Sequence, residues 1–202
     1  AHSDLARKLD TKFLAVPEGR KDYAGEISET IDEAVTALVY NNPIDARYRK
    51  PRSNVEKRYR LRPYTLATFR QGLYLFALDE AAGLVKTFAL ERFTEVVRVR
   101  AQHFEEPLGW RPQAHIAHAF GIISGPPADV AIAFDESEAA YVRERTWHPT
   151  QTFRTLPDGR LELRLQVAPT VELSAWILGF GALAQVLSPP ELVERVGRSL
   201  RQ

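Results

Sequence analysis

The chain has 202 residues, of which 45% are hydrophobic and 26% charged, and its formal net charge is +1. This length and composition allow a buried core in one large domain or two small ones. The chain has no cysteine, which excludes disulfide bonds and thiolate chemistry, and it has no apolar run long enough to span a membrane. We therefore expect a cytoplasmic protein with no membrane partner.

Residues 1–43 are expected to form a polar linker followed by one helix. Apolar residues at helical spacing run from Ile27 to Leu38. Thr30 and Glu33 fit a capping box, so the helix is predicted to begin near Ser28 or Thr30. The Asn-Asn-Pro sequence that follows predicts its end.

Residues 44–103 change from a helical to an alternating apolar pattern, which predicts five or six short antiparallel strands. Pro63 to Phe69 is expected to form a strand of its own, and the turn from Asp79 to Gly83 is expected to close a hairpin. Because an open sheet of this size exposes its edge strands, we expect the strands to close into a small Sm- or SH3-like β-barrel.

The segment from Arg47 to Arg62 is strongly basic, with eight Lys or Arg residues against one acid, Glu56. In the second expected strand, Arg58, Arg60 and Arg62 share one face. Such local basicity in an otherwise slightly acidic chain favours an anionic ligand, such as nucleic acid or a phosphorylated small molecule. The alternative is a solvated basic face without a partner.

Residues 104–127 are rich in proline and glycine and are predicted to connect two domains. Residues 128–202 predict a strand, a helix, a hairpin with an Asp-Gly turn, a long apolar helix over 171–187 and a short helix after Pro190. This order predicts a two-layer domain with helices on one face of a three-stranded sheet. The fold class of the whole chain is therefore predicted to be α+β.

Neither a metal site nor a catalytic site is expected. His115 and His118 are three residues apart, a spacing that can place two imidazoles on one helical face, but no third ligand is evident nearby. The sequence has no glycine-rich phosphate loop and no Gly-Ser-Gly nucleophile elbow. We therefore expect no cofactor and no enzymatic activity.

Three motifs between Leu61 and Phe93 resemble, in order and spacing, those of the WYL family of bacterial regulators. The family is named for a Trp-Tyr-Leu triplet in an Sm-like barrel. The triplet is Leu73-Tyr74-Leu75 here, and Leu61-Arg62-Pro63 resembles the family's earlier Val, any residue, Pro segment. The stretch from Lys86 to Phe93 is similar to the family's Arg, any residue, Phe, any residue, Leu, Asp, Arg, Ile signature. Trp is replaced by Leu73 and Arg by Lys86, and a lysine lacks the bidentate fork of a guanidinium.

The rest of the chain resembles the C-terminal extension that often follows this domain, with the Trp147-His148 pair and the stretch from Trp176 to Gly181. The resemblance implies the effector-sensing part of a bacterial transcriptional regulator. It also implies a homodimer that reads double-stranded DNA through an N-terminal helix-turn-helix, which we expect this sequence to lack. The alternative is an Sm-like nucleic-acid-binding accessory protein without operator recognition.

In the family, basic and aromatic side chains of the barrel are implied to bind a small anionic ligand or a short single-stranded nucleic acid. Stacking on aromatic rings and neutralisation of phosphates by Arg and Lys are consistent with this role. Tyr74 has the alternative of a core position, and Arg92 the alternative of pairing with Glu91 or Glu95. The predicted ligand-binding residues are Arg47, Arg60, Arg62, Tyr74, Lys86 and Arg92.

Overall fold

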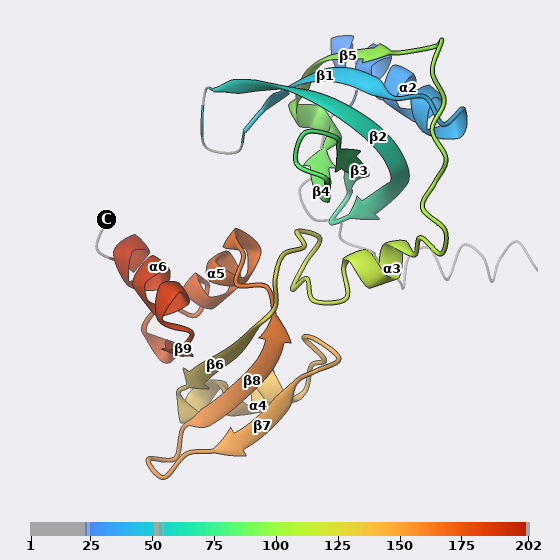
Figure 1. The fold of residues 1–202 in the computed structure, drawn as a ribbon. Helices are drawn as coiled ribbons and strands as arrows, with labels where there is room; N and C mark the ends of the chain where they lie inside the picture. Colours follow the sequence, from blue (N-terminus) through green and yellow to red (C-terminus); the bar gives the residue numbers. More distant parts are fainter. Residues whose placement is uncertain (1–22, 24, 51–52, 54, 201–202) are drawn as a thin grey trace, which may run out of the picture. The chain divides into compact units, whose positions relative to one another are not determined.

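The computed structural model describes residues 23, 25–50, 53 and 55–200. The chain divides into two compact units (Figure 1). The first unit contains the described residues up to Gly83 together with Phe88–Phe104, and the second contains Leu84–Thr87 together with the residues from Glu105 onward. The linker predicted for the first residues of the chain lies almost entirely outside the described residues. Among the described helices, none has the length and apolar character needed to span a bilayer.

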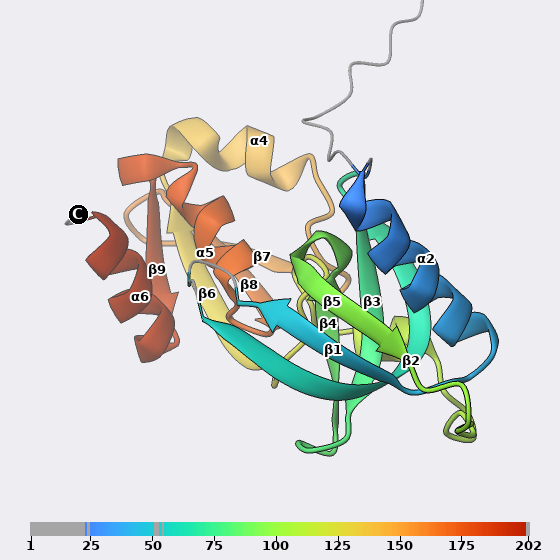
Figure 2. The ribbon, with the colours of Figure 1, turned by 90° about the horizontal axis from the view of Figure 1, so that it is seen from above.

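The first unit opens with helix α2 (Glu26–Val39), which packs against strands β5 and β2 described below and lies beside β5 in Figure 2. The predicted capping box is wrong, because the helix begins earlier, after Gly25, and no side chain caps it. The carboxylate of Glu33 instead lies 3.8 Å from the guanidinium nitrogens of both Arg98 and Arg100. The apolar stripe is confirmed at Ala34, which is fully buried, and at Ile31, which packs against the same core; Ala37, outside the predicted stripe, is also fully buried.

Five strands form one sheet in the order β4-β3-β2-β1-β5. In β1 the predicted alternation is confirmed, because Ile44, Ala46 and Tyr48 are buried and the residues between them are exposed. Buried residues of this face form the core with α2. The strands are β1 (Ile44–Arg49), β2 (Glu56–Phe69), β3 (Gly72–Asp79), β4 (Leu84–Ala89) and β5 (Phe93–Arg98).

Strand β2 is a single strand of 14 residues, where the sequence predicted two. Its pairing with β3 shifts register between Pro63 and Thr65. Proline cannot donate a backbone hydrogen bond, so a strand tolerates it where the ladder of hydrogen bonds is irregular. The strand bends strongly along its length but does not break (Figure 1).

The predicted closed barrel is wrong. Strands β4 and β5 stand at opposite ends of the sheet order, and a three-residue 3-10 turn, η1 (Leu90–Arg92), joins them. Side chains close the interior instead of a backbone ladder, with Phe88, Leu90 and Phe93 packed into the same core as α2. These buried side chains and the helix over the sheet remove the apolar surface from water. The first sheet therefore needs no pairing between β4 and β5.

The second unit contains a four-stranded sheet in the order β7-β8-β6-β9, and the predicted α+β class is confirmed. The hairpin predicted at Asp158-Gly159 joins β7 to β8, and Gly159 has a φ of 86°. The strands are β6 (Ala128–Phe134), β7 (Thr152–Thr155), β8 (Leu161–Val167) and β9 (Ala184–Ser188). The helices are α3 (Pro112–His115), α4 (Ala139–Arg143), α5 (Val171–Leu178) and α6 (Pro190–Leu200), with short 3-10 turns η2 (Glu136–Glu138) and η3 (Gly181–Leu183).

The long helix predicted over residues 171–187 is wrong in its second half. Helix α5 ends at Leu178, and Gly181 has a φ of 56°, which interrupts a right-handed helix. Residues 184–188 then form β9, which pairs with β6. The sheet therefore has four strands where the sequence predicted three.

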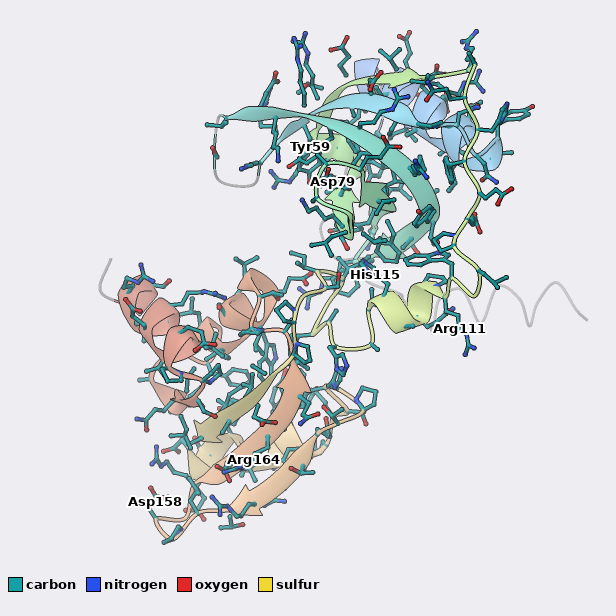
Figure 3. The ribbon with its side chains drawn as sticks, in the orientation of Figure 1. Tyr59, Asp79, Arg111, His115, Asp158 and Arg164 are labelled. Atoms are coloured by element: carbon teal, nitrogen blue, oxygen red, sulfur yellow. The ribbon has the colours of Figure 1, made fainter. Side chains whose placement is uncertain are left out.

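All three longer helices of the second unit pack on one face of its sheet. Val142 of α4, Leu173 of α5 and Leu192 of α6 join the core formed by that face. The opposite face carries polar side chains, including Arg164 (Figure 3). There Glu162 is only 2% exposed and accepts hydrogen bonds from Arg154 and Arg164.

Residues 105–127 are held to the second unit by hydrogen bonds. Thr150 N–H donates to His148 Nδ1, so the other ring nitrogen of His148 carries the proton and donates to Ala117 O at 3.0 Å. The Glu172 carboxylate accepts from the backbone N–H groups of Ile122 and Ile123. The segment is thus part of the second unit rather than a free tether.

Candidate anion-binding site

A basic groove of about 500 Å³ lies on the outer face of the first sheet, over β1, β2 and β5. Its side chains come from three neighbouring strands that display their exposed residues together. It contains both cations and acids, with Val97 as an apolar border. The groove is lined by Asp45, Ala46, Arg47, Arg58, Tyr59, Arg60, Glu95 and Val97.

Strand register explains why these residues meet. Arg47 stands directly opposite Arg58 of β2 and, on its other side, opposite Glu95 of β5. Asp45 stands opposite Arg60 in the same ladder. Directly opposed residues have Cβ atoms about 5 Å apart, so the guanidinium groups share one small area.

Two of the three arginines in the groove already have acidic partners. Arg47 Nε lies 2.7 Å from Glu95, and Arg60 lies 2.7 Å from Asp45. Arg58 is exposed, and it makes no side-chain hydrogen bond or ion pair with any residue that the structure describes. Among the described residues, Arg58 therefore has no acidic partner, while Arg47 opposite it and Arg60 two residues further along β2 are paired with exposed carboxylates.

The ion pair of Arg47 is weak enough to exchange for a ligand, whereas Arg60 is only 27% exposed and also donates a hydrogen bond to Gln102 Oε1 at 2.6 Å. The side chains of Arg47 and Glu95 are 45% and 50% exposed, and pairs of that kind contribute about 0–1 kcal/mol to stability. A phosphate offers a guanidinium fork two acceptors in good geometry, which an exposed monodentate pair does not. An anion in this groove can therefore contact Arg58 directly and draw Arg47 away from Glu95.

The structure brings only two of the six sequence-predicted residues into the groove, Arg47 and Arg60. Arg62 follows on the same face of β2 but lies outside the lining, with its Nε 2.7 Å from Glu80. Tyr74 lies on β3, with its ring 6.4 Å from that of Phe69 in an edge-to-face arrangement. Lys86 lies on β4, outside the groove.

Arg92 lies near an aromatic cluster on the inner face of the first sheet instead. Its charge acts on Tyr48, whose hydroxyl accepts a hydrogen bond from Ala89 N–H at 3.2 Å. Burial raises the pKa of Tyr48 above its usual value, while that hydrogen bond and Arg92 act in the opposite direction. Rings of Tyr48, Tyr59, Phe88 and Phe93 contact one another at centroid distances of 5.1–6.2 Å.

Sequence reasoning did not select Arg58, Asp45 or Glu95 as site residues. The alternation in β2 already placed Arg58 on the face of Arg60. Glu95 could not be assigned to Arg47 from the sequence, because the pairing of β5 with β1 joins segments about fifty residues apart. Tertiary pairing thus decided which cations are neutralised.

The two histidines considered for metal binding have separate surroundings. His115 Nε2 lies 3.0 Å from Ser124 Oγ and 3.5 Å from Thr87 Oγ1, and burial lowers the pKa of His115. The backbone carbonyl of His118 accepts a hydrogen bond from Ala168 N–H. Within the described ranges, no three His, Cys, Asp or Glu side chains are grouped as metal ligands would be.

Comparison with known proteins gives two family matches and several similar solved structures, among them the two that follow. A chain of Proteasome accessory factor B/C (PafBC) of Arthrobacter aurescens is 22% identical, with 98% of this chain and 30% of that chain covered and a TM-score of 0.44. A crystal structure of a CRISPR Cas-related protein is 15% identical, with 87% and 51% covered and a TM-score of 0.57, which supports the fold alone. The chain thus spans about half the length of these proteins or less. No curated protein matches the sequence.

The family models cover both units. A WYL domain model matches residues 29–98, which include the sheet with the basic groove, and a WCX domain model matches residues 126–202. The three sequence motifs around Tyr74 and the extension motifs fall within these ranges, so the predicted resemblance is confirmed. The chain belongs to the WYL-domain proteins and carries a WCX domain after its WYL domain.

Proposed function

We propose that this chain is the effector-sensing part of a cytoplasmic bacterial transcriptional regulator and that the basic groove binds its effector. The effector is an anion, either a nucleotide-like ligand or a short single-stranded nucleic acid. The observation that carries the proposal is the position of Arg58, without an acidic partner among the described residues, between Arg47 and Arg60. The regulatory role itself rests on membership of the WYL-domain proteins.

The size and charge of the groove support this ligand class. A volume of about 500 Å³ lies within the usual range of small-molecule sites, about 300–1,000 Å³. Contacts from Arg to phosphate release counterions, so binding of such a ligand weakens as salt rises.

Regulation requires that the effector favour one of two states. We propose that binding in the groove changes the balance between states of a homodimer that differ in affinity for double-stranded DNA, read by an N-terminal helix-turn-helix. An effector shifts such an equilibrium only by its difference in affinity for the two states. In the alternative, an Sm-like accessory protein, the same groove binds single strands and no operator affinity depends on it.

A salt titration tests the groove directly. Binding of a fluorescent single-stranded oligonucleotide of about six residues is measured by anisotropy for wild type, Arg58→Ala and a control, Arg198→Ala, whose exposed side chain lies on α6. We expect Arg58→Ala to weaken binding at low salt and to reduce the slope of log affinity against log salt by about 0.7, the value for one phosphate contact on a single strand. Arg198→Ala should bind as wild type does.

Two results would contradict the proposal. One is negligible binding of both the oligonucleotide and a mononucleotide at low salt. The other is an Arg58→Ala variant with wild-type affinity and salt slope, which would remove the groove as the site. A full-length regulator whose operator affinity is unchanged by a groove ligand would favour the accessory protein.

A further inference from the structure

A second pocket lies wholly within the second unit, between α4, the end of α5 and η3. It is an open depression of about 380 Å³, and three of its lining residues are aromatic. Only one lining residue carries a charge, and that charge is negative. The aromatic pocket, as we name it, is lined by Glu138, Tyr141, Trp176, Gly179, Phe180 and Leu183.

The ring of Phe180 lies at a large angle to each of the other two rings that line the pocket. The planes of Trp176 and Phe180 meet at 80° with centroids 5.2 Å apart, and those of Tyr141 and Phe180 at 67° with centroids 6.1 Å apart. Trp176 and Phe180 also pack against the core of the unit, which accounts for their presence. Core packing does not account for Tyr141, because 44% of this large residue is exposed.

Tyr141 already holds a cation on its ring. The guanidinium carbon of Arg145 lies 3.7 Å from the centroid of that ring, while Arg145 does not line the pocket. The electron-rich faces of aromatic rings attract cations in this way. The chemistry of the pocket wall is therefore suited to a positive charge.

Glu138 supplies the charge that a cation needs. Its side chain is half-buried and makes no hydrogen bond or ion pair with any residue in the described part of the chain. The helix that follows it, α4, has only five residues, so a helix dipole is a weak reason for an acid at this position. The carboxylate thus lies beside three rings without a cationic partner of its own.

We propose that the aromatic pocket binds a small quaternary ammonium ion. A primary ammonium has three N–H donors to satisfy, and the pocket offers as side-chain acceptors only the Glu138 carboxylate and the Tyr141 hydroxyl. A trimethylammonium group has no N–H donors, and its methyl groups carry the positive charge onto ring faces. Aromatic walls with a charge partner are the recognition mode for such ions. The site is separate from the basic groove and takes ligands of the opposite charge.

Choline serves as the probe, and its uncharged carbon analogue 3,3-dimethyl-1-butanol serves as the reference. Binding is measured by chemical shift changes of the tryptophan indole N–H signals. We expect saturable binding of choline, with the uncharged analogue weaker by about two- to fivefold, the size of one exposed cation–π contact. Tyr141→Leu and Glu138→Gln should each weaken choline binding to a similar extent.

Matched controls separate the pocket from general effects. Glu136→Gln changes an exposed acid two residues before Glu138 and outside the lining, and it should bind choline as wild type does. Arg58→Ala should also leave choline binding unchanged, because the basic groove lies in the other unit. Circular dichroism confirms that each variant is folded.

Several results would overturn the inference. They are the absence of saturable choline binding, equal binding of the uncharged analogue, or a Glu138→Gln variant with wild-type affinity. Sedimentation provides a further check. If the wild type forms a dimer that choline does not affect and that Tyr141→Leu dissociates, a second copy of the chain covers the rings and the pocket is not a cation site.

Discussion

A single methyl group added at Gly121 should loosen the attachment of residues 105–127 to the second unit. An alanine Cβ at this position would lie 2.6 Å from Cδ and Oε1 of Glu172, closer than real Cβ contacts occur. Gly121 does not have a left-handed φ, so its backbone tolerates alanine. The carboxylate must therefore move, and it is the acceptor for Ile122 N–H at 3.1 Å and Ile123 N–H at 2.9 Å.

The magnitude follows from these two hydrogen bonds. A hydrogen bond to a charged group contributes about 1.5–3 kcal/mol to stability, and the half-buried carboxylate leaves room for water to replace part of each. We expect Gly121→Ala to lower the free energy of unfolding of the second unit by about 2–4 kcal/mol. Glu172→Ala should lower it by a similar amount, because it removes the same acceptor.

Urea unfolding followed by tryptophan fluorescence measures this loss in the right unit, because Trp110, Trp147 and Trp176 all belong to the second unit. A double-mutant cycle then isolates the contact. In the Glu172→Ala background, Gly121→Ala should change stability by no more than about 0.5 kcal/mol. Hydrogen exchange of the Ile122 and Ile123 amides should accelerate in each variant.

Equal losses for Gly121→Ala in both backgrounds would refute the reasoning, since the methyl group would then act on something other than the carboxylate. A loss below about 0.5 kcal/mol in the wild-type background would refute it as well, because it would show that the carboxylate moves without losing its hydrogen bonds. Glu191→Ala, an exposed acid on α6, controls for the loss of one negative charge.

Three further predictions follow. Glu95→Gln frees Arg47 and should raise oligonucleotide affinity at low salt by up to about fivefold, the upper worth of an exposed ion pair, and unchanged affinity would count against the groove. Hydrogen bonds and charge from the arginine side chains around Glu162, Arg164 foremost, lower the pKa of that carboxyl. The contribution of Glu162 to the free energy of unfolding is therefore full above the pKa of the unfolded chain, near 4.3, and is lost as the pH falls through the folded pKa. Glu162→Gln should therefore flatten the acid side of the unfolding profile, and an equally steep profile would contradict this. Phe134→Ala removes a fully buried ring and should lower the free energy of unfolding by about 3–5 kcal/mol, measured by urea unfolding; a loss under 1 kcal/mol would contradict the core assignment.

Local patterns in the sequence carried most of the strand assignments. The alternation of Ile44, Ala46 and Tyr48 identified the buried face of β1, and the Asp158-Gly159 pair identified a hairpin. Both depend on interactions within a few residues: side chains alternate along a strand, and Gly159 accommodates a positive φ. The same alternation placed Arg58 and Arg60 on one face.

Features that depend on residues distant in the chain could not be predicted in this way. The apolar stretch after Val171 fits a helix and a strand equally well, and only the free edge of β6 decided that Ala184–Ser188 forms β9. The continuity of β2 through Pro63 likewise depended on a register shift against β3. Short apolar runs do not specify their partners.

The amino-acid sequence alone determined the α+β character of this protein and the presence of a basic face, because these follow from periodicity, turn residues and local charge. Its family followed from the resemblance of three short motifs to those of the WYL family. Tertiary structure decided that the first sheet stays open, that Arg62, Tyr74, Lys86 and Arg92 lie outside the groove, and that Glu95 and Asp45 neutralise two of its three arginines. The physical reason is that the electrostatics of a site depend on which charges lie within a few ångströms of one another. Strand pairing brings residues distant in the chain that close together, and the sequence gives the charges but not their neighbours.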